Sequence, residues 1–233
     1  MSKSKLNVVN PDDIVEEFGA DCFRMYEMFL GPIEQSKPWD TKSIDGVSRF
    51  LRRFWGLYVV EQQVVDFSRE APSKAELKIL HTCIKKVRED IEKLSFNTCV
   101  SAMMICCNEL KALQCKNHSV LSQFALLISP FAPHISAELW ELLGYSGSNL
   151  DTPYPVVVPE YLEEDAFTYT IAINGKRRGE ATFPADADPK AVEAAALSME
   201  IVQKWLEGQT VKKVIVIPKK MVTSRTTLFL CFK

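Results

Sequence analysis

The chain has 233 residues, of which 47% are hydrophobic and 25% are charged, which is typical of a soluble globular protein with room for two modest domains. Its formal net charge of −2 at neutral pH gives no overall sign of nucleic-acid binding. The most apolar stretch, residues 120–143, contains Pro130, Pro133 and two glutamates, which excludes a membrane span.

The charge is unevenly distributed along the chain. From Thr168 onward there are 11 Lys and Arg against 6 Asp and Glu, so this part carries +5 and the remainder carries −7. Such asymmetry predicts a basic contact surface at the C-terminal end.

Near the start of the chain, Ser2, Lys3, Ser4 and Lys5 alternate small hydroxyls with positive charges. This pattern suits a mobile loop that folds over a polyphosphate, because lysine neutralises phosphate charge and serine donates hydrogen bonds. A solvated tail is the alternative interpretation of so short a run.

Two short helices are predicted next. Asn10 is a good N-cap for the first helix, whose buried face would hold Val15 and Phe18. Asp21 is the predicted N-cap of a second helix over residues 22–30.

A long helix is predicted from residue 43 to about residue 67, because apolar side chains recur on one broad face. Arg49, Arg52 and Arg53 share another face at spacings of three and four. They are either part of a solvated surface or contacts for a nucleic-acid backbone, and the sequence leaves both interpretations open.

Three further helical segments complete an antiparallel bundle. Ser73 and Glu76 form a capping box at the start of the clearest helix of the chain. The next helix covers residues 96–110, and the last covers residues 119–143 with an interruption near His134. A packed or capping role is expected for His134, because no acidic partner is evident near it in the sequence.

Proline-rich residues 144–165 are the natural boundary before a different pattern begins. From Thr168 the hydrophobic period becomes two, and Asn174 with Gly175 is a strong signal for a two-residue hairpin turn. Strand and helix signals in the remainder predict a small α+β domain of ββααββ order, with basic residues 176–178 directly after the turn.

The seven cysteines form no C-x-x-C pair, and their odd number indicates a reduced, cytosolic protein. Cys115 and His118 have a spacing seen among metal ligands, but no second pair completes a set of four, so no metal site is predicted. No signal peptide is recognisable either.

Several stretches resemble a known family. Residues 1–4 (Met-Ser-Lys-Ser) look like the end of the KMSKS signature of class I aminoacyl-tRNA synthetases. Residues 7–13 (Asn-Val-Val-Asn-Pro-Asp-Asp), 26–32 (Tyr-Glu-Met-Phe-Leu-Gly-Pro) and 34–40 (Glu-Gln-Ser-Lys-Pro-Trp-Asp) resemble leucyl-tRNA synthetases in particular. The resemblance continues more weakly to the C-terminus, where residues 174–179 are similar to the tRNA-binding domain of bacterial-type enzymes.

This resemblance implies a mainly α fold, in which an antiparallel helix bundle of the anticodon-binding type follows a short helical stem and precedes a small α+β domain. The implied divisions are the KMSKS loop and stem of a catalytic domain over residues 1–40 and the bundle over 41–150. A linker over 151–167 and a small tRNA-binding domain over 168–233 follow.

It also implies a cytoplasmic, monomeric parent enzyme that activates leucine with ATP and Mg and then charges tRNA(Leu). Lys3 would be the catalytic residue that stabilises charge on the departing phosphates, and Ser2, Ser4 and Lys5 would complete the ATP loop. The implied tRNA contacts are all basic: Arg49, Arg52, Arg53, Lys176, Arg177, Arg178, Lys212, Lys213, Lys219 and Lys220.

The chain contains no HIGH-like motif, no Gly-rich nucleotide-binding unit and no editing insertion. It is therefore expected to be inactive alone and to hold no cofactor. Its expected partners are tRNA(Leu) and the catalytic and editing domains of the parent chain, with neither DNA nor a membrane. An RNA-binding module without catalysis, or the same region of an isoleucyl- or valyl-type synthetase, are the alternatives.

Overall fold

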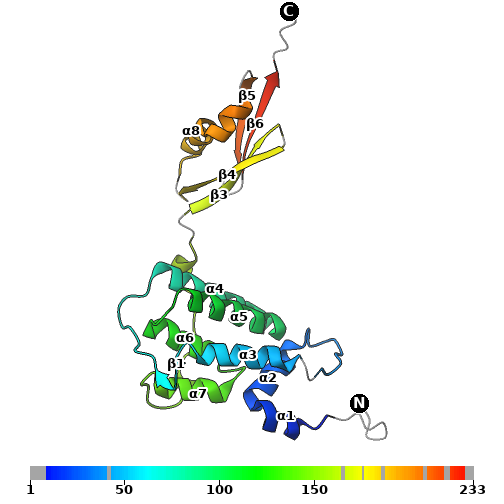
Figure 1. Ribbon diagram of the computed structural model, residues 1–233, viewed down its shortest axis with the longest axis vertical. Coiled ribbons are helices and arrows are strands. Elements are labelled where there is room, and N and C mark those ends of the chain that lie inside the picture. The colour runs from blue at the N-terminus through cyan, green and yellow to red at the C-terminus, as the bar shows by residue number, and fades with distance from the viewer. Residues whose placement is uncertain are drawn as a thin grey trace, which may run out of the picture. The chain divides into compact units, whose positions relative to one another are not determined.

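The computed structural model describes residues 9–40, 43–163, 166–174, 176–184, 187–206, 209–217 and 221–228. They form two compact units, one reaching Leu162 and the other starting at Glu163. The first unit is a helix bundle and the second contains a four-stranded sheet (Figure 1). This architecture confirms the predicted fold class, a mainly α bundle followed by a small α+β part.

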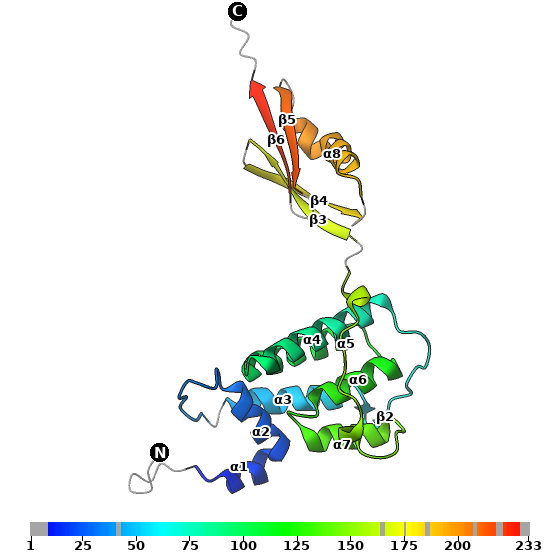
Figure 2. The same ribbon diagram turned by 180° about the vertical axis from the view of Figure 1, so that it is seen from behind.

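The elements of the first unit are α1 (Pro11–Phe18), α2 (Ala20–Phe29), α3 (Ile44–Trp55), β1 (Val59–Val60), β2 (Gln63–Val64), α4 (Lys74–Glu92), α5 (Phe96–Ala112), α6 (His118–Ile128), α7 (Pro133–Leu142) and the 3-10 turns η2 (Asn149–Asp151) and η3 (Pro159–Leu162). In both views of the chain α4 and α5 lie side by side (Figure 1, Figure 2). Their short connection makes them antiparallel neighbours.

The first stem helix, α1, begins with the predicted cap, and the second, α2, does not. The side chain of Asn10 accepts a hydrogen bond of 3.3 Å from the backbone N–H of Asp12. The buried contact of α1 differs from the prediction, because Ile14 is 5% exposed whereas Val15 is 37% exposed. The N-cap of α2 is Gly19, whose φ of +88° favours glycine, and Asp21 has a different role.

The long helix predicted over residues 43–67 is wrong beyond Trp55, where α3 ends. A short hairpin, β1 and β2, follows instead, with Glu61 and Gln62 at φ +50° and +64° in its turn. Valine-rich sequence favours strands over helices, so the apolar residues that suggested one helical face belong to two structures. Tyr58 fixes the change of direction, because its hydroxyl donates a 2.9 Å hydrogen bond to the carbonyl of Leu121 in α6.

The core of the helical unit is continuous from the stem to α7. Phe54 of α3 packs edge-on against Phe124 of α6, with their ring centroids 4.9 Å apart, and against Tyr58 at 5.2 Å. Stem residues such as Met25 and Tyr26 are fully buried in the same core. The stem and the bundle are therefore one packed body.

Most of the segment predicted as a linker over residues 151–167 packs against the bundle. The Tyr154 hydroxyl donates a 2.8 Å hydrogen bond to the Leu127 carbonyl, and the Val158 N–H donates a 3.2 Å hydrogen bond to Nδ1 of His81. The ring of His81 also lies 4.8 Å from that of Tyr161. The helical unit therefore extends to Leu162.

The elements of the second unit are β3 (Ala166–Ile173), β4 (Lys176–Pro184), α8 (Pro189–Ser198), α9 (Glu200–Leu206), β5 (Gln209–Ile217) and β6 (Met221–Leu228), in the predicted ββααββ order. The strand order is β4-β3-β6-β5, with β3 and β6 parallel and the other neighbours antiparallel. The helices cover one face of the sheet (Figure 2), where Ile171 and Ile173 pack with Val192 and Val202.

Candidate nucleic-acid interface

Three groups of basic residues are predicted from the sequence to contact tRNA, and the structure describes the side chains of two of them. Ser2, Lys3, Ser4 and Lys5, the predicted ATP loop, lie outside the described residues, as do Lys219 and Lys220. Lys212 and Lys213 belong to β5, but their side chains are likewise not described. The two groups that can be examined are on α3 and β4.

The α3 group is exposed because the opposite face of the helix supplies the core. Val47, Phe50 and Phe54 are fully buried, and a helix that buries these positions turns Arg49, Arg52 and Arg53 outward. The Arg52 guanidinium donates a 3.0 Å hydrogen bond to the hydroxyl of Ser48, one turn earlier. The three arginines therefore form one basic face, in which spacings of three and four place the charges next to each other.

The β4 group does not form one face, and the strand also contains a bulge. Ile171 pairs with Gly179 and its neighbour Ala172 pairs with Arg177, so Arg178 is an extra residue in the ladder. In a regular strand three consecutive cations would alternate between the two faces of the sheet, and the extra residue interrupts this alternation at Arg178. Each of the three basic side chains consequently has its own surroundings.

Arg177 forms an ion pair with Glu180, with 2.6 Å between Nη2 and Oε1, and both side chains are largely exposed. Arg178 turns towards the helices, where its guanidinium carbon lies 3.5 Å from the centroid of the Trp205 ring. Its Nε is buried and has no hydrogen-bond partner among the described residues. Lys176 is exposed. Of the three basic side chains after the turn, Lys176 and Arg177 are therefore exposed, whereas Arg178 packs on Trp205.

Sequence reasoning missed the contact between the stem and α7. The Asp21 carboxylate accepts hydrogen bonds from the backbone N–H groups of His134, at 3.2 Å, and Ile135, at 2.7 Å. It also lies 2.8 Å from Nδ1 of His134, which gives this histidine the acidic partner that the sequence did not reveal. Asp21 thus caps α7 and not α2, which orients the last helix of the bundle relative to the stem.

A groove of about 690 Å³ adjoins this contact, and its lining is mostly apolar: Ala20, Phe23, Met28, Gly31, Ile33, Phe96 and Pro133, with Asp21, Arg24, Glu27 and His134. Arg24 donates two hydrogen bonds, of 3.0 and 3.1 Å, to the carbonyl of Pro130. The polar groups Asp21 and Arg24 therefore hold the surrounding helices together.

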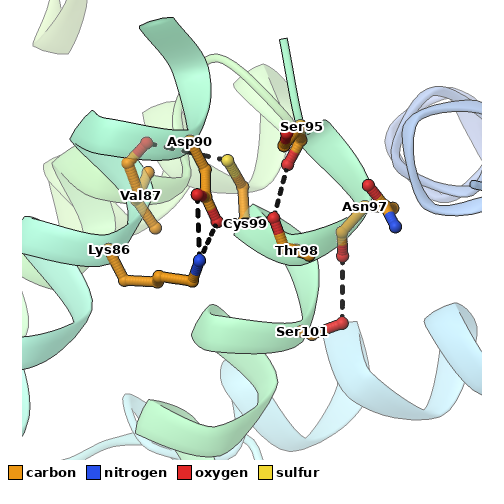
Figure 3. Close-up of polar contacts among 8 residues, drawn as sticks. All are labelled: Lys86, Val87, Asp90, Ser95, Asn97, Thr98, Cys99 and Ser101. Atoms are coloured by element: carbon orange, nitrogen blue, oxygen red, sulfur yellow. Dashed lines mark hydrogen bonds and ion pairs between the residues drawn. The ribbon is translucent and has the colours of Figure 1, made fainter. Parts of the chain in front are cut away.

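The buried charge of Asp90 is also structural (Figure 3). Its carboxylate accepts hydrogen bonds from Lys86 of the same helix, at 2.9 Å, and from the hydroxyl of Thr98 in α5, at 2.5 Å. Burial raises the pKa of Asp90, but these hydrogen bonds outweigh it and hold the pKa below the ordinary value. The network fastens the α4–α5 turn, where the Ser95 N–H donates to the Asp90 carbonyl at 2.8 Å.

Within the described parts of the chain, no group of three or more His, Cys, Asp and Glu is arranged to hold a metal ion. The same parts contain no helix that is both long enough and apolar enough to cross a membrane.

Comparison with known proteins gives consistent matches. Residues 74–194, more than half of the chain, match the family described as the anticodon-binding domain of tRNA ligase. A leucine–tRNA ligase from Bacteroides thetaiotaomicron is 54% identical over 95% of this chain, and one from Cytophaga hutchinsonii is 52% identical over the same share. The chain spans 24% of the length of each of these relatives.

A solved structure agrees with the sequence matches. It is the ternary complex of an Agrobacterium radiobacter K84 LeuRS with tRNA and LeuAMS, and it is similar to 98% of this chain with a TM-score of 0.79 and 25% identity. The match covers 32% of that protein.

Proposed function

Since the chain belongs to the anticodon-binding domain family of tRNA ligases, we propose that it is the tRNA-binding portion of a leucine–tRNA ligase. The observation that carries this proposal is the 54% identity to a leucine–tRNA ligase over 95% of the chain. This identity favours a leucyl-type parent over the isoleucyl- and valyl-type enzymes that the sequence left open.

The proposed mode of binding is electrostatic contact with the RNA backbone. Phosphate contacts from lysine and arginine supply much of the affinity for nucleic acids and position the protein without reading the sequence. The exposed face of Arg49, Arg52 and Arg53 is the first such contact. The basic second unit, with Lys176 and Arg177 exposed, is the other.

The activity belongs to the whole parent enzyme under this proposal. Leucine would be activated by attack of its carboxylate on the α-phosphate of ATP, with pyrophosphate and its bound Mg leaving, before transfer to tRNA(Leu). The resemblance of residues 1–4 to the KMSKS signature supports Lys3 as the group that stabilises the departing phosphates. The parent would act as a cytoplasmic monomer, in which this portion contacts the catalytic and editing domains.

The chain alone would then be an RNA-binding module without catalysis. Its length, 24% of that of the relatives it matches, favours this statement for the isolated chain. One loop lysine cannot position ATP and leucine for in-line attack without the rest of a nucleotide-binding fold. Leucine-dependent ATP–pyrophosphate exchange well above background by the purified chain would overturn this statement.

Measuring tRNA(Leu) affinity at several salt concentrations tests the proposed binding surface. Arg49→Glu with Arg53→Glu should weaken binding and flatten the plot of log affinity against log salt, by about 0.9 for each phosphate that is no longer neutralised. Lys85→Glu with Lys111→Glu is the matched control, because it makes the same charge change at exposed positions of α4 and α5. Equal effects of the two double variants would contradict a specific role for α3.

A further inference from the structure

Trp205 is an exposed aromatic side chain on a helix that otherwise contributes to the core of the second unit. Val202, on the same helix α9, is 2% exposed and packs with Ile171 of the sheet. Trp205 is 47% exposed, and Ile201, one turn before it, is 49% exposed. These two side chains place a small apolar patch on the surface of a basic unit.

One face of the Trp205 ring is already occupied by a cation. The bulge in β4 brings the Arg178 guanidinium carbon to 3.5 Å from the ring centroid, within the range of a strong cation–π contact. This placement leaves Nε of Arg178 buried and unpaired among the described residues, a cost that needs a compensating gain. Fixing the orientation of a half-exposed indole is such a gain.

The surroundings of the ring select the kind of ligand. Gly179 lies against α9, since a Cβ there would come within 3.9 Å of Ile201, so strand and helix meet closely at the patch. Lys176 is two residues before Arg178 and exposed, and Lys204, which adjoins Trp205 in α9, lies 3.8 Å from the carboxylate of Glu200, so Lys176 is the cation available to a phosphate. A flat apolar surface among positive charges favours a planar group that carries a negative charge nearby, as a nucleotide does.

We propose that Trp205 is a stacking platform for a nucleobase of the bound RNA. A base with an exposed face stacks on the indole, Arg178 holds the ring from its other face as a positioning residue, and Lys176 neutralises an adjacent phosphate. This inference rests on the proposed tRNA-binding function. Under this proposal the RNA contacts include an aromatic residue in addition to the basic residues. Arg178 supports the ring and does not contact a phosphate.

The test is tRNA(Leu) binding by the full chain, with affinity and salt dependence measured together. Trp205→Ala should weaken binding roughly tenfold while leaving the salt slope unchanged, because stacking releases no counterions. Trp205→Phe should retain most of the affinity, since a phenyl ring also stacks. Lys176→Ala should lower the slope by about one, as expected for a phosphate contact. Ile215→Ala is the matched control, because it removes an exposed apolar side chain of β5 whose neighbours Val214 and Val216 pack in the core beneath the helices.

A direct readout comes from indole fluorescence. RNA should quench the indole emission of the wild-type chain by more than that of Trp205→Phe. This additional quenching should be lost in Arg178→Ala and restored in Arg178→Lys. Circular dichroism and the melting temperature verify that each variant is folded, and Trp205→Leu, which keeps an apolar side chain but has no ring to stack on, serves if Trp205→Ala is not folded.

The outcomes separate this inference from the function on which it rests. If the wild-type chain binds tRNA and the folded Trp205 variants bind equally well without a loss of quenching, the stacking platform is wrong and the proposed function stands. If the wild-type chain does not bind tRNA(Leu), both are wrong.

Discussion

The carboxylate of Asp21 in α2 accepts a hydrogen bond from the backbone N–H of His134, a residue 113 positions further along the chain. Together with the bond from the Ile135 N–H, this contact caps α7 with a side chain from the stem. The cap joins the beginning and the end of the helical unit through one carboxylate.

Removing this cap should destabilise the helical unit. Asp21→Ala is expected to lower the free energy of unfolding by about 1–2 kcal/mol, because two N–H groups at the start of α7 would have no acceptor. Urea denaturation monitored by circular dichroism measures the change. His134→Ala keeps both backbone bonds and removes a side chain that is 77% exposed, so its cost should be much smaller. A larger effect of His134→Ala would show that the ring, and not the cap, is important.

The Asp90 network should control the packing of α4 against α5 in a pH-dependent manner. Thr98→Val removes a hydrogen bond to a buried carboxylate and should cost about 2 kcal/mol at neutral pH, whereas Thr98→Ser should cost little. The pKa of Asp90 is lowered in the folded chain. The ionised carboxylate therefore stabilises the fold at pH values above 3.8, the ordinary pKa of the group, and this stabilisation is lost as pH falls through the folded pKa. Asp90→Asn should remove that part of the acid dependence, and an unchanged acid profile in this variant would contradict the assignment.

His81 should make the helical unit less stable in mild acid. Its ring is 2% exposed, and burial lowers the pKa of the imidazole below 6.5. The unfolded chain therefore takes up the proton first, and stability that is present above about pH 6.5 is lost as pH falls through the folded pKa. His81→Asn keeps an acceptor for the Val158 N–H without titrating in this range, so its melting temperature should change less between about pH 7.5 and pH 5.5. An equal change in both proteins would refute this role.

Substitutions in the hairpin turn after α3 should stabilise the helical unit. Glu61 and Gln62 both have positive φ, which costs about 1 kcal/mol for an ordinary side chain, whereas Asn-Gly is the preferred pair for such a turn. Glu61→Asn with Gln62→Gly is therefore expected to raise the melting temperature by a few degrees. Gln63→Asn, in the neighbouring strand, is the control and should give no gain. A lower melting temperature in the double variant would show that the turn has a different conformation.

The six described cysteines should be unreactive in the folded chain. All are buried, and burial raises the pKa of Cys22 and Cys107 to about 11 and that of Cys99 and Cys115 to about 12. Little thiolate is thus available at moderately alkaline pH. A thiol-specific disulfide reagent should modify these six only after denaturation, with Cys231→Ser as the background, since Cys231 lies outside the described residues. Rapid modification of several thiols in the native chain would contradict this burial.

Local signals in the sequence predicted the fold well wherever structure is decided locally. The capping box of Ser73 and Glu76 is present as expected, because both partners lie within one helical turn. The prediction of a helix as far as residue 67 was wrong because the turn is formed by Glu61 and Gln62, which are not the residue types usual in such a turn. Valines on either side of an unrecognised turn have spacings that also fit a helix.

Features of the candidate site that depend on tertiary contact could not be predicted in this way. The partner of Asp21 lies 113 residues away, a separation that no periodic pattern encodes. No residue type in β4 marks the bulge at Arg178. The sequence around Trp205 likewise does not show whether this aromatic side chain lies on the surface or in the core. The residues with positive charge were identifiable from sequence, but the direction of each side chain was not.

The extra residue in β4 also determines what an insertion or deletion would do to this surface. Removing the extra residue, Arg178, would restore a regular ladder in which Ile171 still pairs with Gly179 and Ala172 with Arg177, so the neighbouring side chains would keep their sides of the sheet. Lys176 would stay opposite Ile173, but the Trp205 ring would lose the cation that covers one of its faces. Homologous chains with the same strands, with and without this one residue, can therefore differ in whether the indole is held in place, and a comparison of strand boundaries alone would not distinguish them.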